Sequence, residues 1–147
     1  MIRFGISRLP AGDDDAGFLD DLVARGHQAV ELPFVKDFPW KEKRCVSFGK
    51  LAAQRDLDVS VHAPYFAILT VEEEDRAKQC LAALEHTMKL GKALGSRIIC
   101  AHLGNKGGRS GPQLLDLVRA RLEYLAPKVQ HLGVALGLET AGKESAY

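Results

Sequence analysis

The stretch Val59–Tyr65, which reads VSVHAPY, decides the fold that we expect for this chain. Its β-branched residues predict a short strand, and Pro64 ends that strand because proline has no backbone N–H to donate. His62 is therefore expected at the carboxyl end of a strand. In α/β folds this end of the strands carries the functional groups.

Two later segments end in the same way. The run Ile98–His102 reads IICAH, and the run Val134–Glu139 reads VALGLE. Neighbouring parallel strands lie about 4.8 Å apart, so His62, His102 and Glu139 are expected to meet at one edge. Either histidine alone could simply cap or pack against a loop. Three donors at equivalent positions instead predict a metal site, for zinc or manganese by donor type.

The rest of the chain alternates between the two kinds of element. The sequence predicts further strands over residues 3–7 and 29–32, and helices over about 13–25, 41–55, 70–94 and 110–129. Thr70 is expected to cap the third helix, with Glu73 in the reciprocal position of a capping box. Ser110 and Gln113 are expected to form a second capping box. Repetition of one strand–helix unit, with no linker, predicts parallel strands that pair in chain order and are covered by helices.

Two architectures fit this pattern, an open doubly wound sheet and a closed barrel. No glycine-rich dinucleotide fingerprint follows the first strand. The strand residues on the expected face of His62 are small: Ser60, Cys100, Ala135 and Gly137. The residues on the opposite face are branched: Val59, Val61, Ile99, Leu136 and Leu138. Small residues inside and branched residues outside favour a (β/α)8 TIM barrel. The chain supplies about the first four and a half of its β/α units, so residues 1–147 are expected to be the N-terminal part of a single TIM-barrel domain.

Composition and charge narrow the function classes. The 147 residues are 46% hydrophobic with a net charge of +1, which gives no support to a purely electrostatic nucleic-acid binder. The three cysteines, Cys45, Cys80 and Cys100, lack metal-like spacing and are expected to be buried free thiols in a reducing compartment. No run is long enough to span a bilayer. We therefore expect a cytoplasmic protein that does not associate with membranes.

Other candidate residues lie on loops at the same edge. Tyr65 and Trp40 could stack on a base or a sugar as substrate-binding residues, or pack the loops. The segment Gly107–Arg109 could bind phosphate through its amides and the Arg109 guanidinium, or form a tight turn with an exposed arginine. Glu31 could be a further polar group of the site or could have a structural role.

Three short motifs carry a family resemblance: HAPY at 62–65, HLG at 102–104 and LETAGK at 138–143. In this order, over the whole chain, they resemble the endonuclease IV family of apurinic/apyrimidinic endonucleases, most closely its archaeal-type branch. The resemblance implies a TIM barrel with up to three zinc ions. It also implies a hydrolase of DNA repair that cleaves the phosphodiester 5′ to an abasic site.

Residue by residue, the resemblance implies that His62 and His102 bind one zinc and that the catalytic Glu139 bridges two. Tyr65 would lie on the loop that enters DNA at the lesion. The chain departs from the family at Ile68, where Asn is usual, and at Leu103, where Pro or another small residue is usual. These departures affect the DNA-contacting loop more than the metal. The remaining ligands would lie beyond residue 147, so this chain alone is expected to be inactive.

The alternative is a divalent-metal-dependent sugar or sugar-phosphate isomerase or epimerase of the xylose isomerase-like barrels. These enzymes resemble the same superfamily, and the strand Ala29–Leu32 is common to both. They use one divalent metal and acid–base carboxylates to move a proton next to a carbonyl. A third interpretation is a barrel that serves only as a binding module.

Overall fold

The fold is a single parallel sheet whose strands follow one another in chain order. The computed structural model describes residues 2–140. Its strands are β1 (Gly5–Ser7), β2 (Ala29–Pro33), β3 (Asp58–His62), β4 (Ile98–His102) and β5 (Ala135–Glu139), in the order β1-β2-β3-β4-β5. All four neighbouring pairs are parallel, as predicted. The carboxyl ends of all strands therefore lie at one edge of the sheet.

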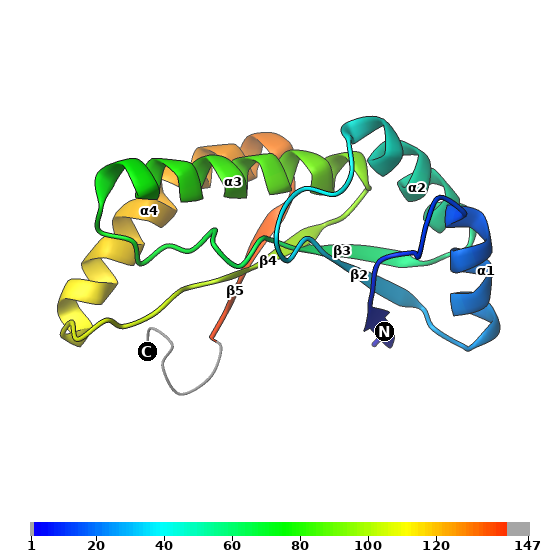
Figure 1. Cartoon of the computed structure of the whole chain (residues 1–147), viewed down its shortest axis with the longest axis horizontal. Helices are drawn as coiled ribbons and strands as arrows, with labels where there is room; N and C mark the ends of the chain where they lie inside the picture. The colour runs from blue at the N-terminus through cyan, green and yellow to red at the C-terminus, as the bar shows by residue number, and fades with distance from the viewer. Residues whose placement is uncertain (1, 141–147) are drawn as a thin grey trace.

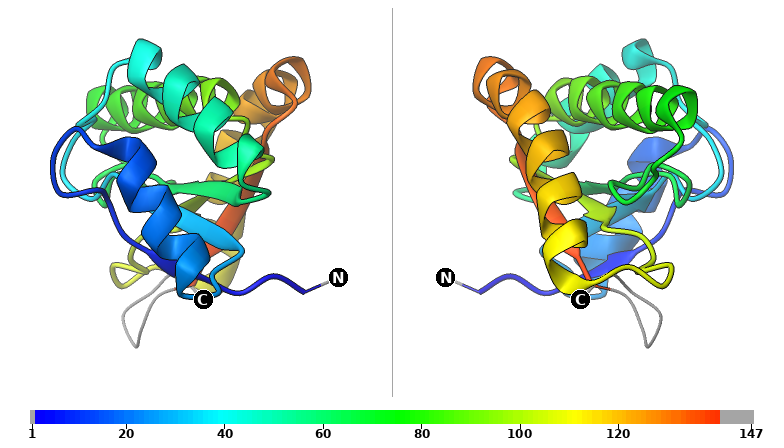
Figure 2. Two further views of the ribbon diagram at one scale, coloured as in Figure 1. Left: turned by 90° about the vertical axis from the view of Figure 1, so that its right-hand side faces the viewer. Right: turned by 90° about the vertical axis from the view of Figure 1, so that its left-hand side faces the viewer.

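A helix follows each of the first four strands. These helices are α1 (Asp15–Ala24), α2 (Glu42–Gln54), α3 (Glu74–Ala93) and α4 (Gly111–Leu132). They form an arc on one side of the sheet (Figures 1 and 2). The arrangement is a partial TIM barrel, which confirms the predicted fold class. Within residues 2–140, no helix combines the length and apolar character needed to cross a membrane.

The core lies between the sheet and this arc of helices. The outward strand residues Val30, Leu32, Val61, Ile99 and Ala101 are almost completely buried there. Each large side chain buried in this way stabilises the fold by about 1.5–3 kcal/mol. The predicted alternation of faces is thereby confirmed for β3 and β4. Leu136 of β5 packs against the same core, whereas Leu138 near the end of that strand is 38% exposed.

The start of α3 differs from the prediction. The helix begins at Glu74, and Glu73 itself is the N-cap, since its carboxylate accepts hydrogen bonds from the amides of Asp75 and Arg76 at 3.0 and 3.1 Å. The predicted cap at Thr70 is wrong because the chain between Thr70 and Glu73 belongs to a loop. At α4, Gln113 accepts from the backbone N–H of Ser110 at 3.2 Å, as the predicted capping box requires.

Candidate metal centre

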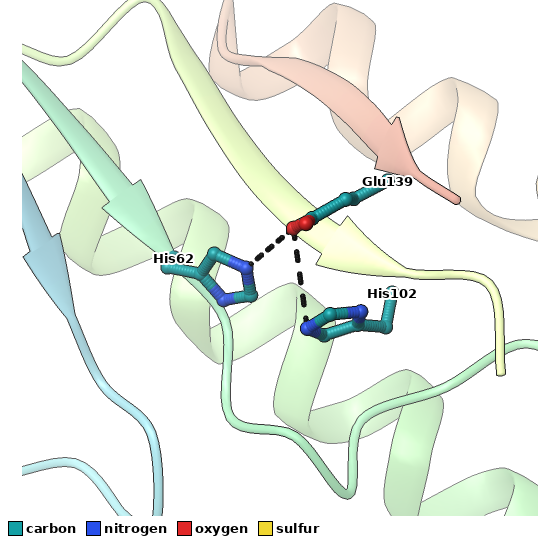
Figure 3. A group of neighbouring side chains, drawn as sticks. All are labelled: His62, His102 and Glu139. Atoms are coloured by element: carbon teal, nitrogen blue, oxygen red, sulfur yellow. Dashed lines mark hydrogen bonds and ion pairs between the residues drawn. The ribbon is translucent and has the colours of Figure 1, made fainter. Parts of the chain in front are cut away.

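The register of the sheet brings two histidines and one glutamate together at the carboxyl edge. His62 of β3 lies opposite Cys100 of β4, and His102 of β4 lies opposite Glu139 of β5. Side chains two positions apart on a strand share a face, so all four side chains belong to the same face. Figure 3 shows His62, His102 and Glu139 pointing toward one another from three successive strands.

The donor atoms of these three residues converge. Oε2 of Glu139 is 2.9 Å from Nε2 of His62 and 3.9 Å from Nε2 of His102. One ligand atom from each residue lies within 4.8 Å of the other two. The convergence that the strand ends predicted is therefore present in the structure.

The hydrogen bonding of His62 fixes which of its nitrogens faces the centre. Nδ1 lies 2.9 Å from the carbonyl oxygen of Ala63, so Nδ1 must carry the proton that it donates. In the neutral ring Nε2 is then an acceptor, and it faces the acceptor oxygen of Glu139 at 2.9 Å. Two acceptors this close need a proton or a metal cation between them. A ring held through Nδ1 to a backbone carbonyl is also the usual arrangement of a metal-binding histidine.

The charge of Glu139 suits a cation. When Nε2 of His62 carries a proton, it donates a hydrogen bond to Glu139; this is the largest cause that holds the pKa of the Glu139 carboxyl below its usual value, and the nearby His102 acts in the same direction. The carboxylate is 44% exposed, whereas the two imidazoles are largely buried. Two imidazole nitrogens and one carboxylate oxygen fit zinc, and also manganese. Three protein donors leave a coordination position for water or substrate, as at catalytic zinc sites.

Cys100 belongs to this centre, which the sequence analysis did not recognise. Its Sγ lies 3.6 Å from Oε2 of Glu139, and it is half-buried. Burial, followed by the charge of Glu139, raises the pKa of the Cys100 thiol to about 11, so the thiol is protonated and can donate. The signal was present in the sequence, because Cys100 shares a face with His102.

Glu31 does not belong to the group of converging donors. Its Oε1 accepts a hydrogen bond from Oγ of Ser7 at 2.8 Å, which links β1 to β2. This contact supports the structural role that was left open for Glu31.

Tyr65 lies beside the metal centre and faces solvent. Its ring centroid is 5.8 Å from that of His62 and 5.1 Å from that of His102, and the residue is 57% exposed. The loop that follows β3 thus places an accessible aromatic ring against both imidazoles. This position is compatible with contact to a base or a sugar bound at the centre.

Trp40 is part of the core, which contradicts the predicted stacking role. The residue is only 5% exposed, and its ring packs against Phe34 and Phe48 at centroid distances of 6.2 and 4.9 Å. The guanidinium of Arg44 lies over the ring at 4.5 Å. Because protein groups occupy its surroundings, Trp40 packs the loop and offers no face to a substrate.

The segment Gly107–Arg109 forms the tight turn that was one of its two predicted alternatives, with the Arg109 amide donating to the Lys106 carbonyl at 3.2 Å, but the role of the Arg109 side chain differs from both alternatives. Its guanidinium donates to three backbone carbonyls, those of Asn105, Lys106 and Thr70, at 2.7–2.8 Å. The side chain is 16% exposed, so it is neither a free phosphate ligand nor an exposed arginine. Its donors are already committed to the protein.

Comparison with known proteins places this chain in a family. Residues 19–147 match the family described as xylose isomerase-like TIM barrel, and the chain belongs to that family. An uncharacterized protein of Methanocaldococcus jannaschii is 26% identical over 153 residues, which cover 100% of this chain and 54% of the relative. The chain thus spans about half the length of the curated relative that it matches.

Solved structures with the same fold have several activities. An L-ribulose 3-epimerase aligns with a TM-score of 0.78 and 20% identity, over 99% of this chain and 52% of that chain. A D-tagatose 3-epimerase-like protein aligns with a TM-score of 0.77 and 17% identity, over 98% and 55%. Endonuclease IV from Thermus thermophilus aligns with a TM-score of 0.69 and 20% identity, over 98% and 54%. At these identities the likeness establishes the fold alone.

Proposed function

We propose that this chain is the N-terminal half of a zinc-dependent apurinic/apyrimidinic endonuclease, which hydrolyses DNA on the 5′ side of an abasic site. One observation carries the proposal: Nε2 of His62, Nε2 of His102 and Oε2 of Glu139 converge at the carboxyl edge of the sheet. The motifs that deliver these side chains are those that resemble endonuclease IV. We also propose a cytoplasmic location, in keeping with three free cysteines.

Each residue has a distinct role in this proposal. A bound divalent metal would activate water and stabilise charge on the phosphate. His62 and His102 would hold that metal through ring nitrogens, and the contact of Nδ1 of His62 with the Ala63 carbonyl would leave Nε2 of that ring free for the metal. Glu139 contributes the negative charge. Tyr65 presents its exposed ring to the sugar or base beside the bound lesion.

The second candidate is a divalent-metal-dependent sugar or sugar-phosphate epimerase. The epimerase structures among the structural neighbours support it.

One experiment separates these candidates. A protein that carries this chain within a complete barrel is incubated with a duplex carrying one abasic site and, separately, with a ketose and its phosphate. The endonuclease proposal expects cleavage on the 5′ side that a strong chelator abolishes and zinc restores. Glu139→Gln should lose this cleavage, whereas the matched control Glu31→Gln should keep it. Retained metal with no cleavage, together with turnover of the ketose, would establish the epimerase instead.

A further inference from the structure

Two loops at the carboxyl edge are packed directly against each other. The β3–α3 loop spans residues 63–73, and the β4–α4 loop spans residues 103–110. The amide of Leu69 in the first donates to the carbonyl of Leu103 in the second at 3.0 Å. The backbone of Gly104 lies so close to the side chains of the first loop that an added Cβ would lie 2.2 Å from Oγ1 of Thr70. The loop after His62 and the loop after His102 therefore behave as one packed unit.

Arg109 joins these loops through several donors at once. Its Nη1 reaches across to the carbonyl of Thr70 at 2.7 Å and to the carboxylate of Glu72 at 3.3 Å. Its Nε and Nη2 donate to the carbonyls of Lys106 and Asn105, both at 2.8 Å. The guanidinium thus stabilises the conformation of the β4–α4 loop and also binds the β3–α3 loop.

The loop held by Arg109 is the one that carries Tyr65. The amide of Tyr65 donates to the carbonyl of Val35 at 3.0 Å, which anchors the β3–α3 loop close to β3. Arg109 fixes the same loop closer to α3, at Thr70 and Glu72. The aromatic ring that contacts both His62 and His102 belongs to the loop that these anchors hold.

We propose that Arg109 is a positioning residue that fastens the Tyr65 loop beside the metal centre and thereby sets the affinity for substrate. The part concerning substrate rests on the proposed function, because it requires Tyr65 to touch the substrate. The attachment of the loop by Arg109 does not depend on the proposed function. Lysine cannot replace this residue, since an ammonium lacks the planar fork that reaches carbonyls on two loops together.

Amide hydrogen exchange on the purified chain tests the fastening. In Arg109→Ala and in Arg109→Lys, the Leu69 amide should exchange at least about tenfold faster, because the local opening of the loop becomes easier. The amides of Val61 and Ile99 in the sheet should keep their rates, and zinc content should be unchanged. Arg119→Ala, which removes an exposed arginine of α4, is the matched control and should alter none of these.

Three results would overturn the proposal. One is unchanged exchange at Leu69 in both Arg109 variants. Another is faster exchange throughout β3 and β4 in Arg109→Lys, which would mean general destabilisation. In the third, the Leu69 amide exchanges at the same rate in the native chain and in Arg109→Lys without phosphate, but inorganic phosphate slows its exchange in the native chain alone. That outcome would make Arg109 an anion ligand.

The effect of Arg109 on substrate affinity is tested by steady-state kinetics. The assay uses the same complete-barrel protein as above, with whichever of the substrates it turns over. Arg109→Lys should raise KM by about tenfold with kcat nearly unchanged, the pattern for lost binding that is equal in ground and transition states. A fall in kcat with constant KM would contradict the positioning role. Failure of the abasic-site assay would refute the proposed nuclease and leave the exchange result on the loop intact, so the two failures are distinguishable.

Discussion

Nε2 of His62 lies 2.9 Å from Oε2 of Glu139, although the residues are 77 positions apart in the chain. The Nδ1 proton of His62 is already donated to Ala63, so either a second ring proton or a metal ion would satisfy the two facing atoms. Glu139→Gln removes the negative charge and should weaken zinc binding by at least about 100-fold, more than is typical for loss of a residue that only supports a ligand. Competition with a chelating dye measures this affinity. Glu31→Gln should bind as the native chain does, and equal affinity in Glu139→Gln would exclude Glu139 as a ligand.

Cys100 should react slowly with alkylating reagents at neutral pH. Its pKa is raised from 9.0 to about 11, so at pH 8 its reactive thiolate is about a hundredfold scarcer than that of an ordinary thiol. The raised pKa means that the protonated form is favoured, and the rate should keep rising with pH until about 11. Mass spectrometry of the peptide that contains Cys100, after timed exposure to iodoacetamide, gives the rate. A rate that levels off near the ordinary thiol pKa of 9.0 would contradict the prediction.

Gly104 should be much less tolerant of alanine than Gly108. Both have a positive φ, +103° and +76°, but an added Cβ meets Thr70 and Ile68 at Gly104 and nothing within 4 Å at Gly108. Gly108→Ala should therefore cost only the backbone strain of about 1–2 kcal/mol. Gly104→Ala adds a clash between two loops and should lower the free energy of unfolding further. Urea unfolding compares the two variants, and equal losses would show that the loops separate easily.

Trp40→Ala should destabilise the fold rather than weaken substrate binding. Truncation of a buried aromatic side chain costs about 3–5 kcal/mol, and Trp40 packs between Phe34 and Phe48. Trp40→Phe keeps most of the packing and should lose less. Denaturant unfolding gives both values. A stable Trp40→Ala variant with impaired substrate binding would restore the stacking role that the sequence suggested.

The sequence was most informative in the strands, where side chains alternate between the two faces of the sheet with a period of two residues. Alternation in β3 and β4 assigned Val61 and Ile99 to the core and put His62 and His102 on the other face, and the strand ends then located the site. Sequence reasoning left two roles open for Trp40 and missed the role of the Arg109 side chain, because both roles depend on partners elsewhere in the chain, Phe48 for one and Thr70 for the other. Cys100 was placed on the face of His62 but not assigned to the site, because a thiol within a strand is usually a core residue. Part of the motif at 138–143 lies outside the described residues, which end at 140.

The strand order also has a consequence for synthesis on the ribosome. Each strand after β1 pairs with the strand before it in the chain. When such a strand leaves the exit tunnel, the strand that it pairs with has therefore already been synthesised. N-terminal parts generally fold first during translation. Glu139 is the last residue of β5, and the complete set of three donors exists only after that strand has emerged and paired. Capture of a metal by the nascent chain would therefore mark the moment at which the fifth strand joins the sheet.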